Sequence, residues 1–346
     1  MAELSCPTPL PARDRVLLGH GSGGTLSAEL LRDVFLPALG NPVLTQLNDQ
    51  AVVSVGGVRL AFTTDSFVVK PLFFPGGNIG SLAVHGTVND LAVGGATPLF
   101  LSAAFIIEEG FSMDELRRVV NSMQSAAAAA GVQVVTGDTK VVERGKGDGL
   151  FINTTGIGIV PDGLELSADH ARPGDKVLLS GGIGEHGIAI LAQREGLEFE
   201  TTIQSDSAAL HTLVAAMLKA TSAIRCMRDP TRGGLSSTLN EIAAQSRVGI
   251  AVDESAIPVR EEVRGACELL GLDPMYVANE GKLVAIVEPS SADAVLNAMR
   301  NHPLGQHAQI IGTVNRENRG LVTMRTTLGT TRIVDMLAGD QLPRIC

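Results

Sequence analysis

The sequence predicts an α/β protein of two domains. Its 346 residues are more than one hydrophobic core usually organises, because domains commonly stop growing near ~250–300 residues. An apolar segment, a Gly-rich loop and a helical pattern follow one another at 15–35 and again from 177 onward. Turn formers at 172–175 separate the two occurrences. We expect a flexible N-terminus at 1–14, an N-terminal domain at 15–170, a C-terminal domain at 171–330 and a mobile tail at 331–346.

A Gly-rich segment opens the first domain. Three glycines within 19–24 formally match the G-x-G-x-x-G pattern of dinucleotide-binding folds, and Asp49 lies beyond the next apolar run. However, the apolar segments 51–55 and 58–63 are joined by Gly56-Gly57, which predicts a β-hairpin, whereas a dinucleotide-binding unit needs a helical crossover there. The Gly-rich segment is therefore either a loop that folds over phosphates or a plain flexible turn.

The rest of the first domain reads as two helices and two strands. The pattern at 79–93 is typical of a helix. Ser112 and Glu115 form a capping box at the start of a second helix, which Gly131 ends. The expected strands are 132–135 and 151–160.

Aspartates recur at or near the ends of apolar elements in this domain, and two of them, Asp65 and Asp138, stand directly beside Thr or Gly. Side chains from different elements can converge at such positions. Any single one of them could be a cap or turn residue. As a set of hard oxygen ligands without His or Cys, they suit Mg²⁺ that bridges phosphates rather than zinc or iron. The set is Asp49, Asp65, Asp90 and Asp138.

The second domain offers an anion site and a candidate base. A strand at 177–180 enters a Gly-rich loop at 181–187. Arg228 and Arg232 lie beside a Gly-Gly helix start, which favours anion binding, although a surface loop with an internal Arg–Asp pair would look the same. Glu280 precedes an apolar strand and is a candidate general base by its position.

Composition excludes several classes of partner. A net charge of -10 disfavours a phosphate backbone, and the absence of Trp with 3% aromatic residues leaves little surface for stacking bases. The four cysteines (Cys6, Cys226, Cys267 and Cys346) are scattered, which fits a reducing compartment. No signal region and no run long enough to span a bilayer is evident. We expect a cytoplasmic protein that contacts neither nucleic acid nor membrane.

The chain ends on a thiol. Cys346 follows a short segment with turn formers and no long apolar run, which predicts a mobile tail. At about 3.3 Å per residue, the segment from Asp335 to Cys346 could extend roughly 35 Å. Such a tail could carry a thiol from one active site to another, or the terminal Cys could be accidental.

Taken together, these segments resemble the PurM-type superfamily of ATP-dependent aminoimidazole ribonucleotide synthetases, and more closely its HypE family of [NiFe]-hydrogenase maturation proteins. The loop and aspartate motifs are shared across the superfamily, whereas the terminal Pro-Arg-Ile-Cys is specific to the HypE family. The resemblance runs from about Val16 to Cys346. The matching segments are 21–24, 64–66, 71–80, 86–92, 137–140, 228–234 and 343–346.

The resemblance implies a two-domain PurM-like fold, with N-terminal sheets that join into a barrel across a homodimer, and with ATP and Mg²⁺ bound between the domains. It implies catalytic roles for Cys346, Lys140 and Glu280. The implied nucleotide-binding residues are Gly21, Ser22, Gly23, Gly24, Asp65, Asn89, Thr139, Arg228 and Arg232. The implied metal ligands are Asp49, Asp65, Asp90 and Asp138.

The implied activity is the ATP-dependent dehydration of an S-carbamoyl group on Cys346 to a thiocyanate. A HypF-type carbamoyltransferase would supply the carbamoyl group, and a HypC–HypD complex would receive the cyanide. Two alternatives stay open: another ATP-dependent enzyme of the superfamily, such as selenophosphate synthetase or thiamin-phosphate kinase, or a non-enzymatic carrier. ATP consumption that depends on a carbamoylated Cys346 would distinguish all three.

Overall fold

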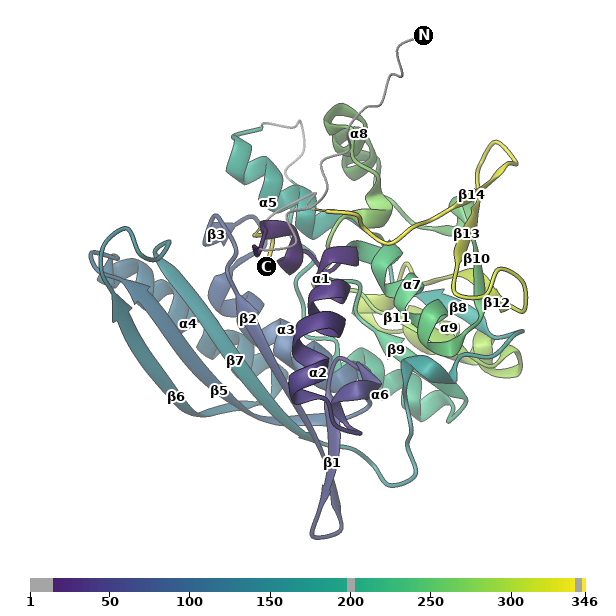
Figure 1. The fold of residues 1–346 in the computed structure, drawn as a ribbon, viewed down its shortest axis with the longest axis horizontal. Coiled ribbons are helices and arrows are strands. Elements are labelled where there is room, and N and C mark those ends of the chain that lie inside the picture. The colour runs from purple at the N-terminus through teal and green to yellow at the C-terminus, as the bar shows by residue number, and fades with distance from the viewer. Residues whose placement is uncertain (1–14, 198–202, 340–343) are drawn as a thin grey trace.

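The protein folds around two β-sheets, each packed against helices (Figure 1). The structure is a computed structural model that describes residues 15–197, 203–339 and 344–346. The chain passes from the first sheet to the second between Ile159 and Lys176. In Figure 1 the first sheet lies on the left and the second on the right, and the C-terminus lies between them.

The first sheet has five strands in the order β1-β2-β7-β5-β6. Only β5 and β6 run parallel, because the helix α4 crosses over between them. The hairpin predicted at Gly56-Gly57 is confirmed, since both glycines have positive φ angles of 59° and 84° that a tight two-residue turn requires. The strands are β1 Ala51–Val55, β2 Val58–Phe67, β5 Thr97–Glu108, β6 Gln133–Val142 and β7 Leu150–Ile159. A separate small hairpin pairs β3 Phe73–Phe74 with β4 Gly77–Asn78.

Two helices cover one face of this sheet, and both were predicted. In α3, Ile79–Val93, the Asn78 side chain accepts hydrogen bonds from two backbone amides at the N-terminus, and nearly all residues are buried. In α4, Met113–Ala130, Ser112 caps the start and Gly131 ends the helix in the left-handed conformation. The core between α3, α4 and the sheet contains Leu82, Val119 and Ile152.

The opposite face of the first sheet is uncovered in the described chain. Phe62, Phe100 and Ile157 lie side by side on neighbouring strands, because Ile157 pairs with both of the other two. Their side chains are exposed by 47%, 42% and 37% respectively. An apolar surface of this kind commonly marks an interaction site.

The second sheet has seven strands in the order β14-β13-β10-β12-β8-β11-β9 and is covered on both faces. The helices α6 His211–Ala220 and α9 Ala292–Arg300 pack on one face, and α7 Gly234–Ser246 packs on the other. Two further helices, α5 Glu185–Glu195 and α8 Glu261–Leu270, pack together beside the sheet. The strands are β8 Lys176–Leu179, β9 Ile224–Arg228, β10 Gly249–Asp253, β11 Val284–Val287, β12 Gln309–Asn315, β13 Val322–Arg325 and β14 Thr331–Ile333.

The expected strand before the first Gly-rich loop is absent. Residues 15–17 form no regular element and Leu18–Gly21 is a 3₁₀ turn. A helical segment follows as α1 Thr25–Leu30, a π-helical stretch Leu31–Phe35 and α2 Leu36–Leu39. The apolar residues before the loop find no sheet edge to pair with, so the two occurrences of the loop are not structural repeats.

The segment 331–346, which was predicted to be a mobile tail, is packed at both of its described ends in this structure, and its mobility stays a prediction. Strand β14 pairs with β13, and Val334 is fully buried. The last three residues return to the first domain, where the Val68 amide donates to the Cys346 carbonyl at 2.9 Å. Cys346 is only 9% exposed. The terminal residues therefore dock in a manner that residue composition alone did not indicate.

Candidate active site

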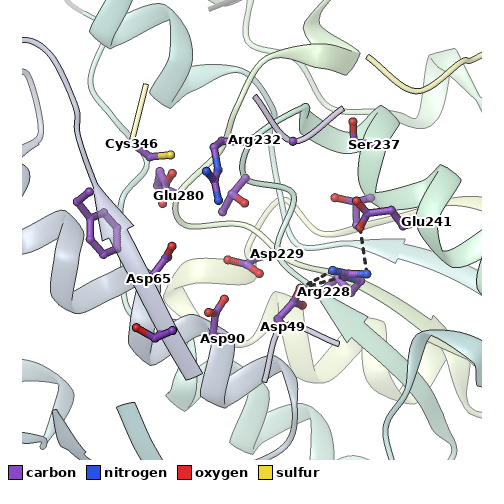
Figure 2. Close-up of a pocket in the computed structure, with 15 residues that line it drawn as sticks. Asp49, Asp65, Asp90, Arg228, Asp229, Arg232, Ser237, Glu241, Glu280 and Cys346 are labelled. Atoms are coloured by element: carbon purple, nitrogen blue, oxygen red, sulfur yellow. Dashed lines mark hydrogen bonds and ion pairs between the residues drawn. The ribbon is translucent and has the colours of Figure 1, made fainter. Parts of the chain in front are cut away.

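Acidic side chains from both domains converge on a cavity of about 260 Å³. Asp65 and Asp90 come from the first domain, and Asp229 and Glu280 come from loops of the second (Figure 2). The cavity is slightly smaller than typical ligand pockets, which are ≈ 300–1,000 Å³, so it suits phosphate groups rather than a whole nucleotide. Three of the predicted metal ligands, Asp49, Asp65 and Asp90, line it.

Strand alternation and a glycine bring the first-domain acids together. Thr63 and Asp65 point from β2 toward α3, and the Thr63 hydroxyl donates to Asp90 Oδ2 at 2.7 Å. Gly86 on α3 makes this approach possible, since a Cβ there would lie 2.9 Å from the Phe67 ring and 3.4 Å from Asp65 Oδ2. Gly86 therefore leaves room for Asp65.

Burial among like charges raises the proton affinity of these acids. Burial and then the nearby Asp229 raise the pKa of Asp90 well above its ordinary value. Burial and then Asp49 raise the pKa of Asp229 to about 8. The pKa of Asp65 is also raised, mainly by burial. The cavity thus has an excess of negative charge that a bound cation would offset.

This arrangement predicts a stability that depends on pH. Asp229 has an ordinary pKa of 3.8 and a folded-state pKa of about 8, so the folded state holds more protons than the unfolded state between these values. Without added ligands, the melting temperature should therefore fall as pH rises from about 4 to about 8. Calorimetry across this range checks it, and Asp229→Asn should flatten the decline. A melting temperature that rises steadily through the window in the parent would contradict the prediction.

The predicted arginines have different surroundings. Arg228 Nη2 lies 2.5 Å from Asp49 Oδ1, and its Nη1 lies 3.0 Å from Glu241 Oε2, so its charge is neutralised within the protein. Arg232 faces Cys346 and the acids across the cavity (Figure 2). Cys346 and the nearby acids raise the pKa of Arg232, although burial opposes this. Arg232 is therefore the better placed of the two to meet an anion.

The first Gly-rich loop closes the cavity on one side. A Cβ on Gly23 would lie 2.5 Å from the Arg232 carbonyl oxygen, and one on Gly24 would lie 2.1 Å from the Leu337 carbonyl oxygen. Arg232 Nη1 donates to the Gly21 carbonyl at 3.2 Å, and the Ser22 hydroxyl donates to the Gly339 carbonyl at 2.7 Å. Of the four predicted loop residues, only Gly23 lines the cavity, whereas the others hold the loop against its neighbours.

Cys346 and Glu280 lie next to each other at one end of the cavity (Figure 2). Burial raises the pKa of the Cys346 thiol to about 12, so the docked thiol is protonated. Burial and the nearby Asp229 raise the pKa of Glu280 well above its ordinary value, and its Oε1 has no hydrogen-bond partner among the described residues. Asn89 does not line the cavity, but its amide donates to the Glu280 carbonyl at 3.3 Å and so supports this loop.

Three predicted residues on β6 lie away from the cavity within one chain. Asp138 lies in the same cross-strand row as Ser66 of β2, because Asp138 pairs with Ala104, Ala104 with Asn153, and Asn153 with Ser66. Because side chains alternate along a strand, Asp138 and Lys140 point to the uncovered face, opposite to Asp65. They are 62% and 68% exposed and form an ion pair with each other. Thr139 does not line the cavity either.

Some residues that line the cavity were not predicted. Asp229 lies inside the arginine motif, where a local Arg–Asp pair was only the alternative interpretation. Glu241 lies on α7, and no motif marks it. Ser237 and Thr238 on the same helix also line the cavity. In the sequence, Ser237 and Thr238 could have been found as hydroxyl residues close to a helix start marked by Gly-Gly.

The donors fit a metal that shares its coordination with a substrate. Among the described residues, no three His, Cys, Asp or Glu side chains form a group that could hold an ion by themselves. Mg²⁺ usually binds one or two carboxylates together with substrate phosphates and water. Mutually repelling carboxylates around a small cavity match that mode.

Comparison with known proteins matches both domains. The N-terminal domain model of AIR synthase related proteins matches residues 47–160, and the C-terminal domain model matches 172–325. The chain is 60% identical to the carbamoyl dehydratase HypE of Cupriavidus necator, over 96% of this chain and 95% of that protein. A HypE structure in complex with ATP shares 52% identity at a TM-score of 0.81, covering 96% of this chain and 100% of that one. A HypE–HypF complex contains a chain of 50% identity at a TM-score of 0.85, covering 89% of this chain and 99% of that one.

Proposed function

The chain belongs to the AIR synthase related family and, within it, to the HypE carbamoyl dehydratases, and on this premise we propose that Cys346 carries the group that its cavity dehydrates. The protein is an ATP-dependent carbamoyl dehydratase of hydrogenase maturation. The similarity does not favour selenophosphate synthetase, thiamin-phosphate kinase or a non-enzymatic carrier. The observation that carries the proposal is the terminal thiol docked among the acids of the cavity.

The reaction removes one water from an S-carbamoyl group. The C=O bond is broken, the two N–H protons are lost and a C≡N bond forms, which leaves a thiocyanate on sulfur. ATP supplies the phosphoryl group that makes the amide oxygen leave as phosphate, and Mg²⁺ would offset the charge on the transferring group. Asp49, Asp65, Asp90 and the newly found Asp229 are the residues that would hold the metal with the phosphates.

Arg232 and Glu280 act on the two ends of the carbamoyl group. Arg232 would stabilise negative charge that develops on the oxygen side, since it is the cavity cation that faces Cys346. Glu280 would accept a proton from the nitrogen, because its buried carboxylate has a raised pKa and an oxygen with no partner among the described residues. Because the carbamoylated side chain of Cys346 is neutral, burying it beside these two residues costs little desolvation free energy.

Loading of the thiol requires a different tail position. A thiol with a pKa of about 12 is a poor nucleophile near neutral pH. Its ordinary pKa would be regained only in a more solvated place, outside the cavity. We therefore place acceptance of the carbamoyl group outside the cavity and its dehydration inside.

Glu280→Gln tests the assignment of the base. We expect the fold and ATP binding to persist, while single-turnover dehydration of the carbamoylated protein slows about a hundredfold, as is usual when a positioned proton acceptor is lost. Mass spectrometry of the C-terminal peptide measures the loss of water over time. Glu261→Gln, on the exposed start of α8, is the matched control. An unchanged rate in Glu280→Gln would remove this residue from the chemistry.

The partners follow from the same assignment. A close relative has been solved as a HypE–HypF complex, so a HypF-type carbamoyltransferase is the proposed donor for Cys346. A HypC–HypD complex is the proposed acceptor of the cyanide, and the cytoplasm is the proposed location. Among the described residues, no helix is long and apolar enough to cross a membrane.

The uncovered face of the first sheet supports a homodimer. Phe62, Phe100 and Ile157 form an exposed apolar row, and burying it against a second copy would remove that surface from water. Asp138 and Lys140 lie on this same face, so a second copy is the proposed route by which they join an active site. Their catalytic and metal-binding roles therefore depend on the dimer.

Light scattering at micromolar concentration is expected to give the mass of a dimer. Phe62→Asp should shift the protein toward a monomer, because it introduces a charge into the apolar row. Leu269→Asp is the control, since Leu269 is 81% exposed on α8, away from the sheet. A parent protein that is monomeric under these conditions would rule out the interface.

A further inference from the structure

The docked end of the chain is held by its backbone carbonyls. The Lys70 amide and Arg194 Nη2 donate to the Arg344 carbonyl at 3.2 and 2.8 Å. His186 Nε2 lies 2.8 Å from the Ile345 carbonyl oxygen. His186 is fully buried on the first turn of α5, the helix of the second domain that also carries Arg194. Its bond to Ile345 is the contact nearest in sequence to Cys346 that a side chain makes.

The hydrogen bonds define the state of His186. A carbonyl oxygen only accepts, so Nε2 carries the proton and Nδ1 is the acceptor in the neutral ring. Nδ1 lies 2.8 Å from Ser205 Oγ, and that hydroxyl accepts from the Ser207 amide at 3.1 Å, which leaves its own proton for His186. Burial lowers the pKa of His186, in agreement with a neutral ring. The ring also makes an edge contact with Phe74, with centroids 5.6 Å apart.

The loop that contains Ser205 also holds Glu280, the proposed proton acceptor. Asp206, next to Ser205, accepts hydrogen bonds from the Glu280 and Gly281 amides at 3.1 and 3.3 Å. Lys282 Nζ lies 3.2 Å from Asp206 Oδ2 and fixes its carboxylate. A Cβ on Gly281 would lie 1.8 Å from the Asp206 carbonyl oxygen, so the two loops are in close contact. One side of the dipeptide Ser205-Asp206 thus contacts the tail through His186, and the other positions Glu280.

We propose that His186 is a positioning residue that seats the terminal segment, and that Ser205-Asp206 links this seating to the placement of Glu280. When the Ile345 carbonyl meets Nε2, the next residue, Cys346, lies beside Glu280. The role in the reaction rests on the proposed function of Cys346, whereas the seating of the tail does not. His186 was part of a Gly-rich segment to which the sequence assigned no chemistry.

Two amide substitutions separate the two bonds of the ring. In His186→Gln the amide nitrogen takes the place of Nε2 and can still donate to Ile345. In His186→Asn the amide takes the place of Nδ1, so it can reach Ser205 but not the tail. His85→Ala is the matched control, because His85 on α3 bonds Ser207 of the same loop at 2.9 Å without a described contact to the tail.

The first measurement is the rate at which iodoacetamide modifies Cys346, followed on the C-terminal peptide without ATP or partners. Iodoacetamide reaches Cys346 when the tail is undocked, and the loss of one hydrogen bond shifts the equilibrium between docked and undocked tail roughly fivefold. We expect modification about fivefold faster in His186→Asn, and parent rates in His186→Gln and His85→Ala. Cys226 is buried in β9, so its modification rate measures opening of the second domain itself and serves as an internal control. A parent rate in His186→Asn, or a parallel rise at Cys226, would overturn the proposal.

The second measurement is single-turnover dehydration of the carbamoylated protein at varied ATP. His186→Asn should lower the maximal rate about fivefold or more and leave the ATP concentration for half-maximal rate unchanged, since His186 does not line the cavity. His186→Gln should restore most of the rate. A change confined to the ATP dependence, or no rescue by Gln, would reject the positioning role. If instead Cys346 proved not to be the carrier, the labelling result would still decide whether His186 seats the tail.

Discussion

Cys346→Ala is expected to lose all dehydratase activity while it keeps its fold and its affinity for ATP. The reaction needs a sulfur to carry the carbamoyl group, and the other described cysteines, Cys226 and Cys267, are buried in a strand and a helix away from the cavity. In the parent, the carbamoylated C-terminal peptide should lose the mass of one water with Mg²⁺-ATP but not with a non-hydrolysable analogue. Intact-peptide mass spectrometry measures this.

The control for Cys346→Ala is Cys267→Ala, which removes a comparably buried thiol from α8. Each substitution deletes one buried sulfur, so each should cost about 1 kcal/mol of stability or somewhat more. Only the substitution at 346 should stop the reaction. Normal hydrogenase maturation by Cys346→Ala would show that the carrier assignment is wrong.

Asp90→Asn is expected to slow Mg²⁺-ATP turnover about a thousandfold, because charge stabilisation by a bound metal contributes several kcal/mol to the barrier and each 1.36 kcal/mol is tenfold. The fold should persist. Asp90 is partly buried and lies among Asp229, Asp65 and Asp49, so a neutral amide removes repulsion, and the melting temperature without ligands should stay the same or rise. Phosphate release and calorimetry measure the two effects.

Asp114→Asn serves as the control, since Asp114 is 89% exposed on α4 and away from the cavity. Turnover at the parent rate in Asp90→Asn would exclude Asp90 from the metal site. A fall in both turnover and melting temperature would instead indicate that the carboxylate supports the fold. Asp138→Asn tests the dimer instead. Asp138 lies on the uncovered face, so this substitution can lower turnover only if a second copy brings that face to a cavity.

The sequence by itself determined the elements and most of their chemistry. Local signals were sufficient where the cause is local: Gly56-Gly57 for a turn with two positive φ angles, Ser112 and Gly131 for the ends of α4, and the pattern of α3. The acids Asp49, Asp65 and Asp90 were chosen from their settings in the sequence, and Glu280 and Cys346 from their positions. The structure gathers all five around one cavity.

Only the tertiary structure decided which face each residue occupies and what holds the end of the chain. Asp138 and Asp65 look alike in sequence, but their positions in the paired strands place them on opposite faces of one sheet. The tail looked free because its own residues carry little apolar pattern, yet its carbonyls bond to Val68, Lys70 and His186. Backbone hydrogen bonds of this kind leave no trace in side-chain composition, since every residue has the same carbonyl, and only the fold brings the donors to it.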